Sequence, residues 1–158
     1  NIWDKVYWRN KSETAVRLSS STSNYYNFVL TWLVWASGDI TSLLCKNLTD
    51  TISWWYCFCS LFNGATSLTS SPSLPATTIP TYCYYTMFKW CSNLETIPKL
   101  PATAVQIQSY YQMFQNCSKI KLSSTRTWAY QTEYRIPTTW TWTAWTAWAW
   151  FAIIASHA

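Results

Sequence analysis

The sequence predicts an α/β solenoid, in which about three 26-residue units, each with a short strand and a short helix, stack behind an N-terminal β cap. Three observations support this prediction: a pattern that recurs between residues 57 and 121, Pro-containing segments at a fixed place in the unit, and apolar–polar alternation near the N-terminus. A fixed period of this size is typical of stacked units, each too small to bury its own apolar face.

The repeat is visible when Cys57, Cys83 and Ser109, which are equally spaced along the chain, are aligned. The positions that follow them then match in residue type. The matching groups are Leu61 and Phe62 with Met87 and Phe88 and with Met113 and Phe114; Ala65 with Cys91 and Cys117; Leu68 with Leu94 and Ile120; and the sequence Leu-Pro-Ala-Thr at 74–77 and 100–103. We expect the apolar groups to form continuous buried columns.

Within one unit, the aromatic segment 82–88 is interpreted as a short helix or helical turn, and 93–97 as a strand. Residues 98–101 must be extended, because proline fixes its own φ and disfavours helix in the residue before it. The third unit loses the Leu-Pro-Ala-Thr sequence after Leu122 but keeps its apolar positions. We therefore expect it still to stack.

The chain divides into three parts on these patterns. Residues 1–48 are predicted to form a β-rich cap, since apolar and polar residues alternate in them as in half-buried strands. The solenoid is expected over 49–134. Residues 135–158 are rich in Trp and Thr and are predicted to form a C-terminal cap or tail. Because the chain begins at Asn1 without an initiator Met, it reads as a piece of a longer protein.

The motif Met-Phe-x-x-Cys-Ser-x-Leu followed by Pro-x-Leu-Pro-Ala-Thr, at 87–103, resembles the BspA-like leucine-rich repeat family of bacterial surface proteins, which also occurs in phages. The lead-in segments 24–29 and 36–44 look like those that such proteins carry. The resemblance covers roughly residues 1–135. It implies a leucine-rich repeat stack with a binding role and no family active site.

Composition narrows the functional classes. Only 11% of the residues are charged, against about 25% in an average soluble domain. The net charge is +5, but the basic residues are scattered, so we expect no nucleic-acid-binding surface. No apolar run reaches the roughly 18 residues that a membrane-spanning helix needs. The sequence therefore predicts neither a nucleic-acid partner nor a membrane span.

The six cysteines recur largely with the period of the repeat. A buried column of cysteines acts as a set of small apolar side chains with weak S–H donors. The alternative is a disulfide framework, which an even number of cysteines in a secreted chain permits. We favour free buried thiols, because the spacing is that of the core. A zinc site is not indicated, since Cys57 and Cys59 have no second pair at ligand spacing.

The thirteen tryptophans stand beside only two glycines. Trp90 aligns with Gly64 and Asn116, which are residue types that tolerate a left-handed backbone. In the family resembled, Gly usually stands at the positions of Trp3, Trp32 and Trp90. We hypothesise that many of these tryptophans are glycine in the natural protein, which follows if the gene uses UGA for glycine. If they are tryptophan, Trp140, Trp142 and Trp145 form either a cap on the last coil or an aromatic platform for sugars and partner side chains.

No pattern indicates catalysis or a cofactor. The single His157 lies at the end of the chain, the six acidic residues are dispersed, and no phosphate-binding loop or metal-ligand cluster is present. We therefore expect a protein that is not an enzyme and holds neither cofactor nor metal.

The predicted function is a surface-displayed binding or adhesion module, on a cell surface or secreted, whose partner is a protein or a surface glycan. The alternative is a structural virion component, such as a decoration, fibre or tail-associated protein, that contacts sister subunits as a homo-oligomer or binds the host surface. Candidate binding residues project from the predicted strands or lie in the tail: Ser67, Thr69, Asn93, Glu95, Lys119, Lys121, Trp140, Trp142 and Trp145.

Overall fold

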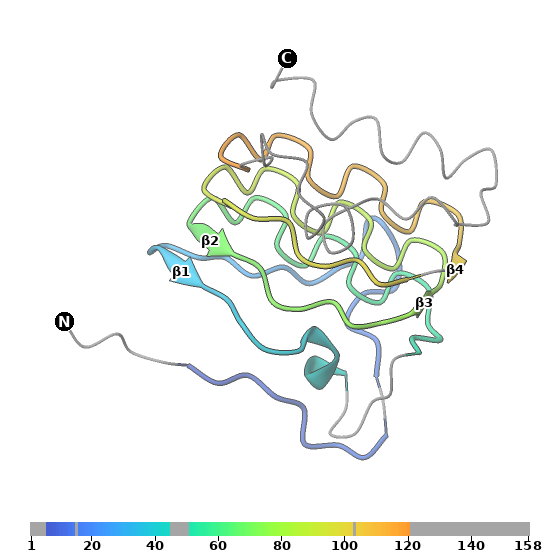
Figure 1. Cartoon of the computed structure of the whole chain (residues 1–158). Helices are drawn as coiled ribbons and strands as arrows, with labels where there is room; N and C mark the ends of the chain where they lie inside the picture. Colours follow the sequence, from blue (N-terminus) through green and yellow to red (C-terminus); the bar gives the residue numbers. More distant parts are fainter. Residues whose placement is uncertain (1–5, 15, 45–50, 103, 121–158) are drawn as a thin grey trace.

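The computed structural model describes residues 6–14, 16–44, 51–102 and 104–120. Its regular elements are short. They are strands β1 (Val34–Trp35), β2 (Leu68–Ser70), β3 (Thr78–Ile79) and β4 (Ala104–Val105), and one 3-10 helix, η1 (Ile40–Leu43). Figure 1 shows the chain winding through coils that lie on one another in sequence order. Turns, and not regular elements, make up most of each coil.

All the strand pairing in the described residues is parallel. β1 pairs with β2, and β3 pairs with β4 at a register that joins equivalent residues of successive units, such as Thr78 and Ala104. Two isolated bridges, Asp39 with Ser73 and Thr51 with Thr78, are parallel as well. Parallel pairing between segments one coil apart is what stacking of successive coils produces.

A run of β-turns occupies the aromatic segment of each unit, where a short helix was expected over 82–88; the described residues contain no α-helix. The strand expected at 93–97 does not form either, since this segment is a turn followed by irregular backbone. In this run the backbone N–H groups alternate between two kinds of acceptor. Those of Cys59 and Leu61 donate to the carbonyl at the start of their own turn, within the coil. Those of Phe58 and Ser60 donate to carbonyls of the next coil, at Cys83 and Tyr85. Half of the amides therefore join neighbouring coils.

The turn runs also share a periodic backbone conformation. Every fourth residue has a positive φ, at the same three places in each unit: Tyr56, Ser60 and Gly64; Tyr82, Thr86 and Trp90; Gln108, Gln112 and Asn116. A positive φ at the third residue of a β-turn is the mark of type II geometry. It interrupts helical backbone at regular intervals, which explains why the segment does not form a helix.

Trp90 is poorly suited to its position among these residues. Its φ of 65° matches those of Gly64 (76°) and Asn116 (63°) in the same column, and its side chain is 53% exposed. A bulky side chain in this region strains the backbone, whereas glycine does not. This geometry is what the hypothesis of glycine at position 90 requires. Trp32 does not have a positive φ, and Trp3 lies outside the described residues.

A column of phenylalanines runs through the core along the stack. Phe28, Phe62, Phe88 and Phe114 stack in series, with ring centroids 5.2, 5.4 and 5.6 Å apart. The last three rings are buried, and Phe28 is half-buried. Trp8 ends the column with an edge-on contact to Phe28 at 5.6 Å. Burying large rings on both faces is a strong source of folding free energy.

Other buried columns follow the period of the repeat. Leu68, Leu94 and Ile120 are buried, and so are the rings of a second aromatic column: Phe58, Tyr84 and Tyr110, with centroid distances of 5.8 and 5.7 Å. The sequence alignment placed Leu68, Leu94 and Ile120 together, whereas it did not include the second aromatic column.

The cysteines that the structure describes lie in the core and form no disulfide. The described ones are Cys57, Cys59, Cys83, Cys91 and Cys117, all buried with free thiols. Cys91 Sγ donates to the Phe62 carbonyl and Cys117 Sγ to the Phe88 carbonyl, both at 3.0 Å. These two carbonyls also accept the N–H groups of Ala65 and Cys91, so the thiol supplies a second donor to a carbonyl of the preceding coil. The sequence favoured free buried thiols over disulfides, and these five cysteines have free buried thiols.

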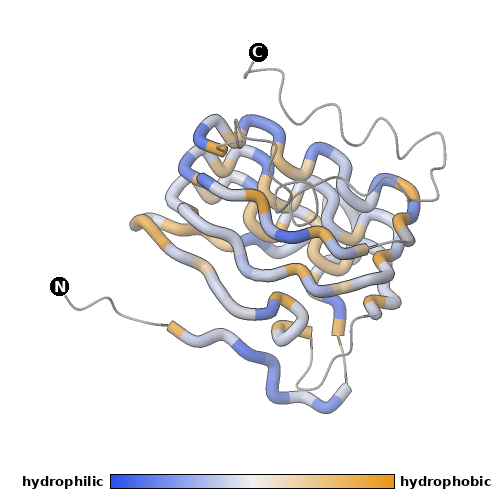
Figure 2. Tube along the Cα trace, viewed as in Figure 1, coloured by the Kyte–Doolittle hydropathy of each residue, from blue (hydrophilic) through white to orange (hydrophobic). Residues whose placement is uncertain are grey.

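The N-terminal coil differs from the repeats. Residues 16–44 form a longer coil, in which Phe28 matches Phe62 and Val34 matches Leu68, a wider sequence spacing than the repeats have. Residues 6–14 run outside it, where the Asn10 N–H donates to the Ser42 carbonyl at 2.9 Å. The short β1 is the only strand here among the described residues, so most of the expected β cap is irregular. Figure 2 shows hydrophobic residues at the tip of this coil.

Candidate functional site

The first predicted binding column contains Ser67, Asn93 and Lys119. Lys119 is exposed, while Ser67 and Asn93 are half-buried. Lys119 Nζ donates to Asn93 Oδ1 at 2.6 Å, and Asn93 Nδ2 donates to the Thr66 carbonyl at 2.6 Å. The structure therefore brings the amide and the ammonium of neighbouring coils together at the surface. Because both ends of the Asn93 amide are engaged in these bonds, the group that the pair presents to a partner is the exposed Lys119 ammonium, held in a fixed place on the surface.

The second predicted column is partly covered. Thr69 Oγ1 donates to the Val34 carbonyl at 3.0 Å, so this hydroxyl holds the N-terminal coil against β2. Glu95 is exposed, and its backbone N–H donates to the Thr69 carbonyl at 3.2 Å. Of the two described members of this column, Glu95 is exposed and Thr69 is half-buried. Lys121, Trp140, Trp142 and Trp145 lie outside the described residues.

A half-buried tyrosine cluster on the turn runs was not singled out from the sequence. Tyr56 stacks on Tyr82 at 4.7 Å, and Tyr85 stacks on Tyr111 at 5.0 Å. An edge-on contact between Tyr82 and Tyr85, at 5.6 Å, joins the two pairs. Burial raises the pKa of Tyr85, and the neighbouring Tyr111 raises it further. The one-period spacing within each stacked pair was the signal that could have revealed this cluster.

Burial makes these thiols unreactive at neutral pH. Burial raises the pKa of Cys57 and Cys117 to about 12, and raises that of Cys83 well above its ordinary value. The thiolate is the reactive form of cysteine, so a raised pKa suppresses nucleophilic and redox chemistry at neutral pH. These side chains therefore act in packing.

The side chain of Asp39, beside η1, forms hydrogen bonds that cap this helix. Asp39 Oδ1 accepts hydrogen bonds from the N–H and from Oγ1 of Thr41, both at 2.7 Å. This is an N-cap interaction, which satisfies a free N–H at the start of the helix. Over the described part of the chain, no three His, Cys, Asp or Glu side chains gather in a way that could hold a metal ion.

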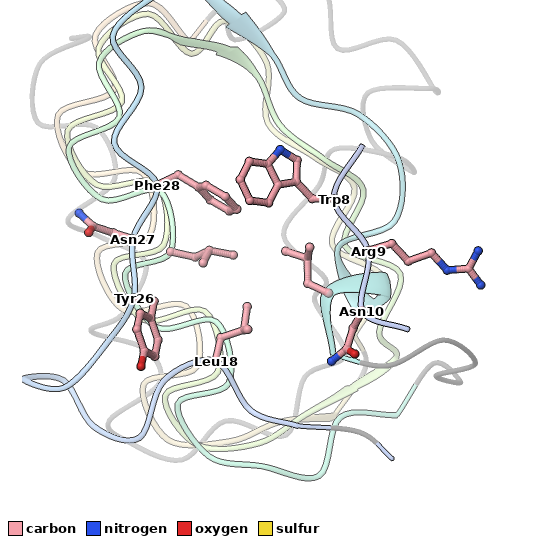
Figure 3. Close-up of a pocket in the computed structure, with 9 residues that line it drawn as sticks. Trp8, Arg9, Asn10, Leu18, Tyr26, Asn27 and Phe28 are labelled. Atoms are coloured by element: carbon pink, nitrogen blue, oxygen red, sulfur yellow. The ribbon is translucent and has the colours of Figure 1, made fainter. Parts of the chain in front are cut away.

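A pocket lies at the N-terminal end of the stack. It has a volume of about 290 Å³. Its lining combines apolar side chains from three segments with a polar rim: Trp8, Arg9, Asn10, Leu18, Tyr26, Asn27, Phe28, Leu43 and Leu61. In Figure 3 the side chains of Trp8, Phe28 and Leu18 point into the pocket, whereas Arg9 and Asn27 point away from it. The sequence did not reveal this pocket, because it depends on how residues 6–14 pass over the N-terminal coil.

Within the residues that the structure describes, we find no helix of the length and hydropathy needed to cross a membrane.

No protein-family model matches the chain, and no curated protein or solved structure matches it either.

Proposed function

We propose that this chain is a non-enzymatic binding module, displayed on a cell surface or secreted, and built as a short leucine-rich repeat solenoid. Its partner is a protein or a surface glycan. The stacking of buried side chains from successive units supports the solenoid, and the motif at 87–103 supports its leucine-rich type. Contact would be made along the exposed side of the stack, by residues from several coils at once.

The observation that carries the proposal is the linked pair Asn93 and Lys119. Their side chains come from neighbouring coils, meet at 2.6 Å and leave the Lys119 side chain exposed. Because the backbone holds successive coils in register, these groups are presented to a partner at little cost in conformational entropy. Several weak contacts at fixed spacing then add up to useful avidity.

Adhesion to immobilised surfaces tests this function. The labelled chain is passed over a film of mucin glycoprotein and over a glycan-free film of serum albumin. We expect retention on at least one film, and about a fivefold loss of retention when Asn93 and Lys119 are both changed to Ala, because a charge-assisted donor pair is removed. The matched control is the double change Gln106→Ala and Lys11→Ala. It removes one amide and one ammonium from exposed positions elsewhere.

Equal retention of the Asn93/Lys119 variant and the unchanged chain on the film that binds would disprove the role of this column. Absence of retention on both films would count against the adhesion function itself.

A structural virion component is the second candidate. It is favoured by the exposed apolar residues of the N-terminal coil, since Val29, Trp32 and Trp35 are at least 80% exposed. Large exposed apolar surfaces commonly mark contacts between proteins. Ordered oligomers in sedimentation and negative-stain microscopy, lost when Trp32 and Trp35 are changed to Ser, would support this candidate over adhesion.

A further inference from the structure

One core column lacks a member in the N-terminal coil. In the repeats, Leu61, Met87 and Met113 are buried at equivalent positions of successive coils. The residue that matches Leu61 in the N-terminal coil is Asn27, since the next residue, Phe28, stacks on Phe62 and donates its N–H to the Leu61 carbonyl at 2.8 Å. Asn27 points away from the core (Figure 3). The core is therefore one apolar side chain short beneath Leu61.

The pocket of about 290 Å³ occupies this place. Leu18, Leu43 and Leu61 are among the residues that line it, and Trp8 and Phe28 form an aromatic corner with their rings edge to face. Figure 3 shows the Trp8 and Phe28 rings turned toward its centre. Its interior is thus made of hydrocarbon and aromatic surface, as in most small-molecule sites.

The polar groups around the pocket offer little to a polar ligand. Asn10 Nδ2 donates to the Leu44 carbonyl at 2.9 Å, and Asn10 Oδ1 accepts from the Ser12 N–H at 2.9 Å, so both ends of this amide are engaged. Arg9 extends away from the cavity into solvent. Water inside the pocket would have few partners, and its displacement by an apolar group would be favourable.

We propose that this pocket binds a small, uncharged aromatic molecule of about two fused rings. The volume sets an upper limit on the size, because an enclosed apolar cavity of about 150 Å³ accommodates one benzene and this pocket is open to solvent. The ring character follows from the Trp8–Phe28 corner, which offers edge and face contacts to a third ring. This site lies at the end of the stack and does not depend on the surface column of the proposed function.

Indole is a suitable probe, because it has two fused rings and no charge. The chain carries ¹³C-labelled leucine methyl groups, and indole is titrated to millimolar concentration. We expect the methyl resonances of Leu18, Leu43 and Leu61 to shift together and to saturate. Glucose, a ring with a polar periphery, should leave them unchanged. This contrast separates the pocket from glycan binding elsewhere on the chain.

Two matched pairs of variants test the location. Leu43→Phe fills the pocket and should raise the Kd for indole about tenfold, whereas Leu33→Phe makes the same change at an exposed site outside it and should not. Tyr26→Ala removes part of the exposed rim and should raise the Kd about threefold, with Tyr25→Ala as its control. The Tyr26 pair tests the site even if Leu43→Phe disturbs folding.

Three results would overturn the proposal: no saturable methyl shifts with indole, shifts that avoid Leu18 and Leu61, or equal affinities in all four variants.

Discussion

The repeat coils bury their apolar side chains more completely than the N-terminal coil does. In the repeats, Phe62 and Phe88 are covered on both faces by rings 5.2–5.6 Å away. In the N-terminal coil, Phe28 has the half-exposed environment of a terminal unit, and many large apolar side chains face solvent. These are Val16, Tyr25, Tyr26, Val29, Trp32, Leu33 and Trp35, to which the segment 6–14 adds Val6, Tyr7 and Trp8.

This difference shows what a neighbouring coil contributes. A repeat coil has a neighbouring coil on each side, which supplies hydrogen-bond partners and covers its apolar side chains. Each core side chain therefore packs on the equivalent side chains of the two neighbouring coils. The N-terminal coil has such a neighbour on one side. Its other side is covered by residues 6–14, which leave the pocket beneath Leu61. The candidate ligand site is a consequence of that incomplete cover.

The largest expected effect is on the phenylalanine column. Phe88→Ala should lower the free energy of unfolding by about 3–5 kcal/mol, because it leaves a cavity between two rings. Phe28→Ala should cost only about 1–2 kcal/mol, since this ring is half-buried. Urea denaturation of the two variants measures the difference. Equal losses would show that the N-terminal coil is packed as tightly as the repeats.

An alkaline pH should weaken the repeats through their thiols. The pKa of Cys57 and Cys117 in the folded chain is raised to about 12 from an ordinary 9.0, so between these values the unfolded chain loses protons that the folded chain retains. Stability is therefore fully present below pH 9.0 and falls as the pH rises toward about 12, by about 1.4 kcal/mol per pH unit for each such thiol.

Denaturation midpoints measured from pH 7 to 11 would show this decline, and Cys117→Ala should reduce its slope. Cys117→Ala also loses the hydrogen bond to the Phe88 carbonyl, so the slope and not the absolute stability is the informative quantity. A slope unchanged by the substitution would rule out ionisation of this thiol as a cause.

The smallest expected effect is at the left-handed bend. Trp90→Gly should raise the free energy of unfolding by about 1 kcal/mol, because it relieves the strain of a bulky residue at φ 65°. Gly64→Ala should lower it by a similar amount at φ 76°, although a Cβ there would meet no other atom within 4 Å. Thermal unfolding of both variants checks the pair. A destabilised Trp90→Gly would mean that its ring makes contacts worth more than the strain.

Position 90 also bears on whether UGA codons in the gene encode glycine or tryptophan. If UGA encodes glycine in the native host, protein from that host has a mass lower by roughly 130 Da for each tryptophan replaced. Intact-mass measurement therefore decides the matter. A mass that fits thirteen tryptophans would exclude recoding.

The buried columns could be predicted from the sequence, because a regular stack repeats its side-chain environment at every period. Phe62, Phe88 and Phe114 lie in series, as the alignment indicated, and Cys91 and Cys117 make the same bond to the preceding coil. Apolar residue type and spacing carry that information.

The backbone of the turn runs could not be predicted in the same way. Tyr82, Thr86 and Gln112 have positive φ, although their residue types do not favour it, so tertiary stacking overrides local preference. The register of the N-terminal coil, which pairs Val34 with Leu68, was hidden as well, since that coil shares no repeated motif with the others. The pocket followed from this register and was therefore missed.

The alternation of amide partners in the turn runs restricts how the chain can change length. Inserting one residue between Phe58 and Phe62 would exchange the amides that face the next coil with those that close turns, and would move core side chains to the outside. Insertions and deletions in this region are therefore expected to add or remove complete 26-residue repeats. Such a protein can grow by duplication of whole blocks while its existing contacts stay intact.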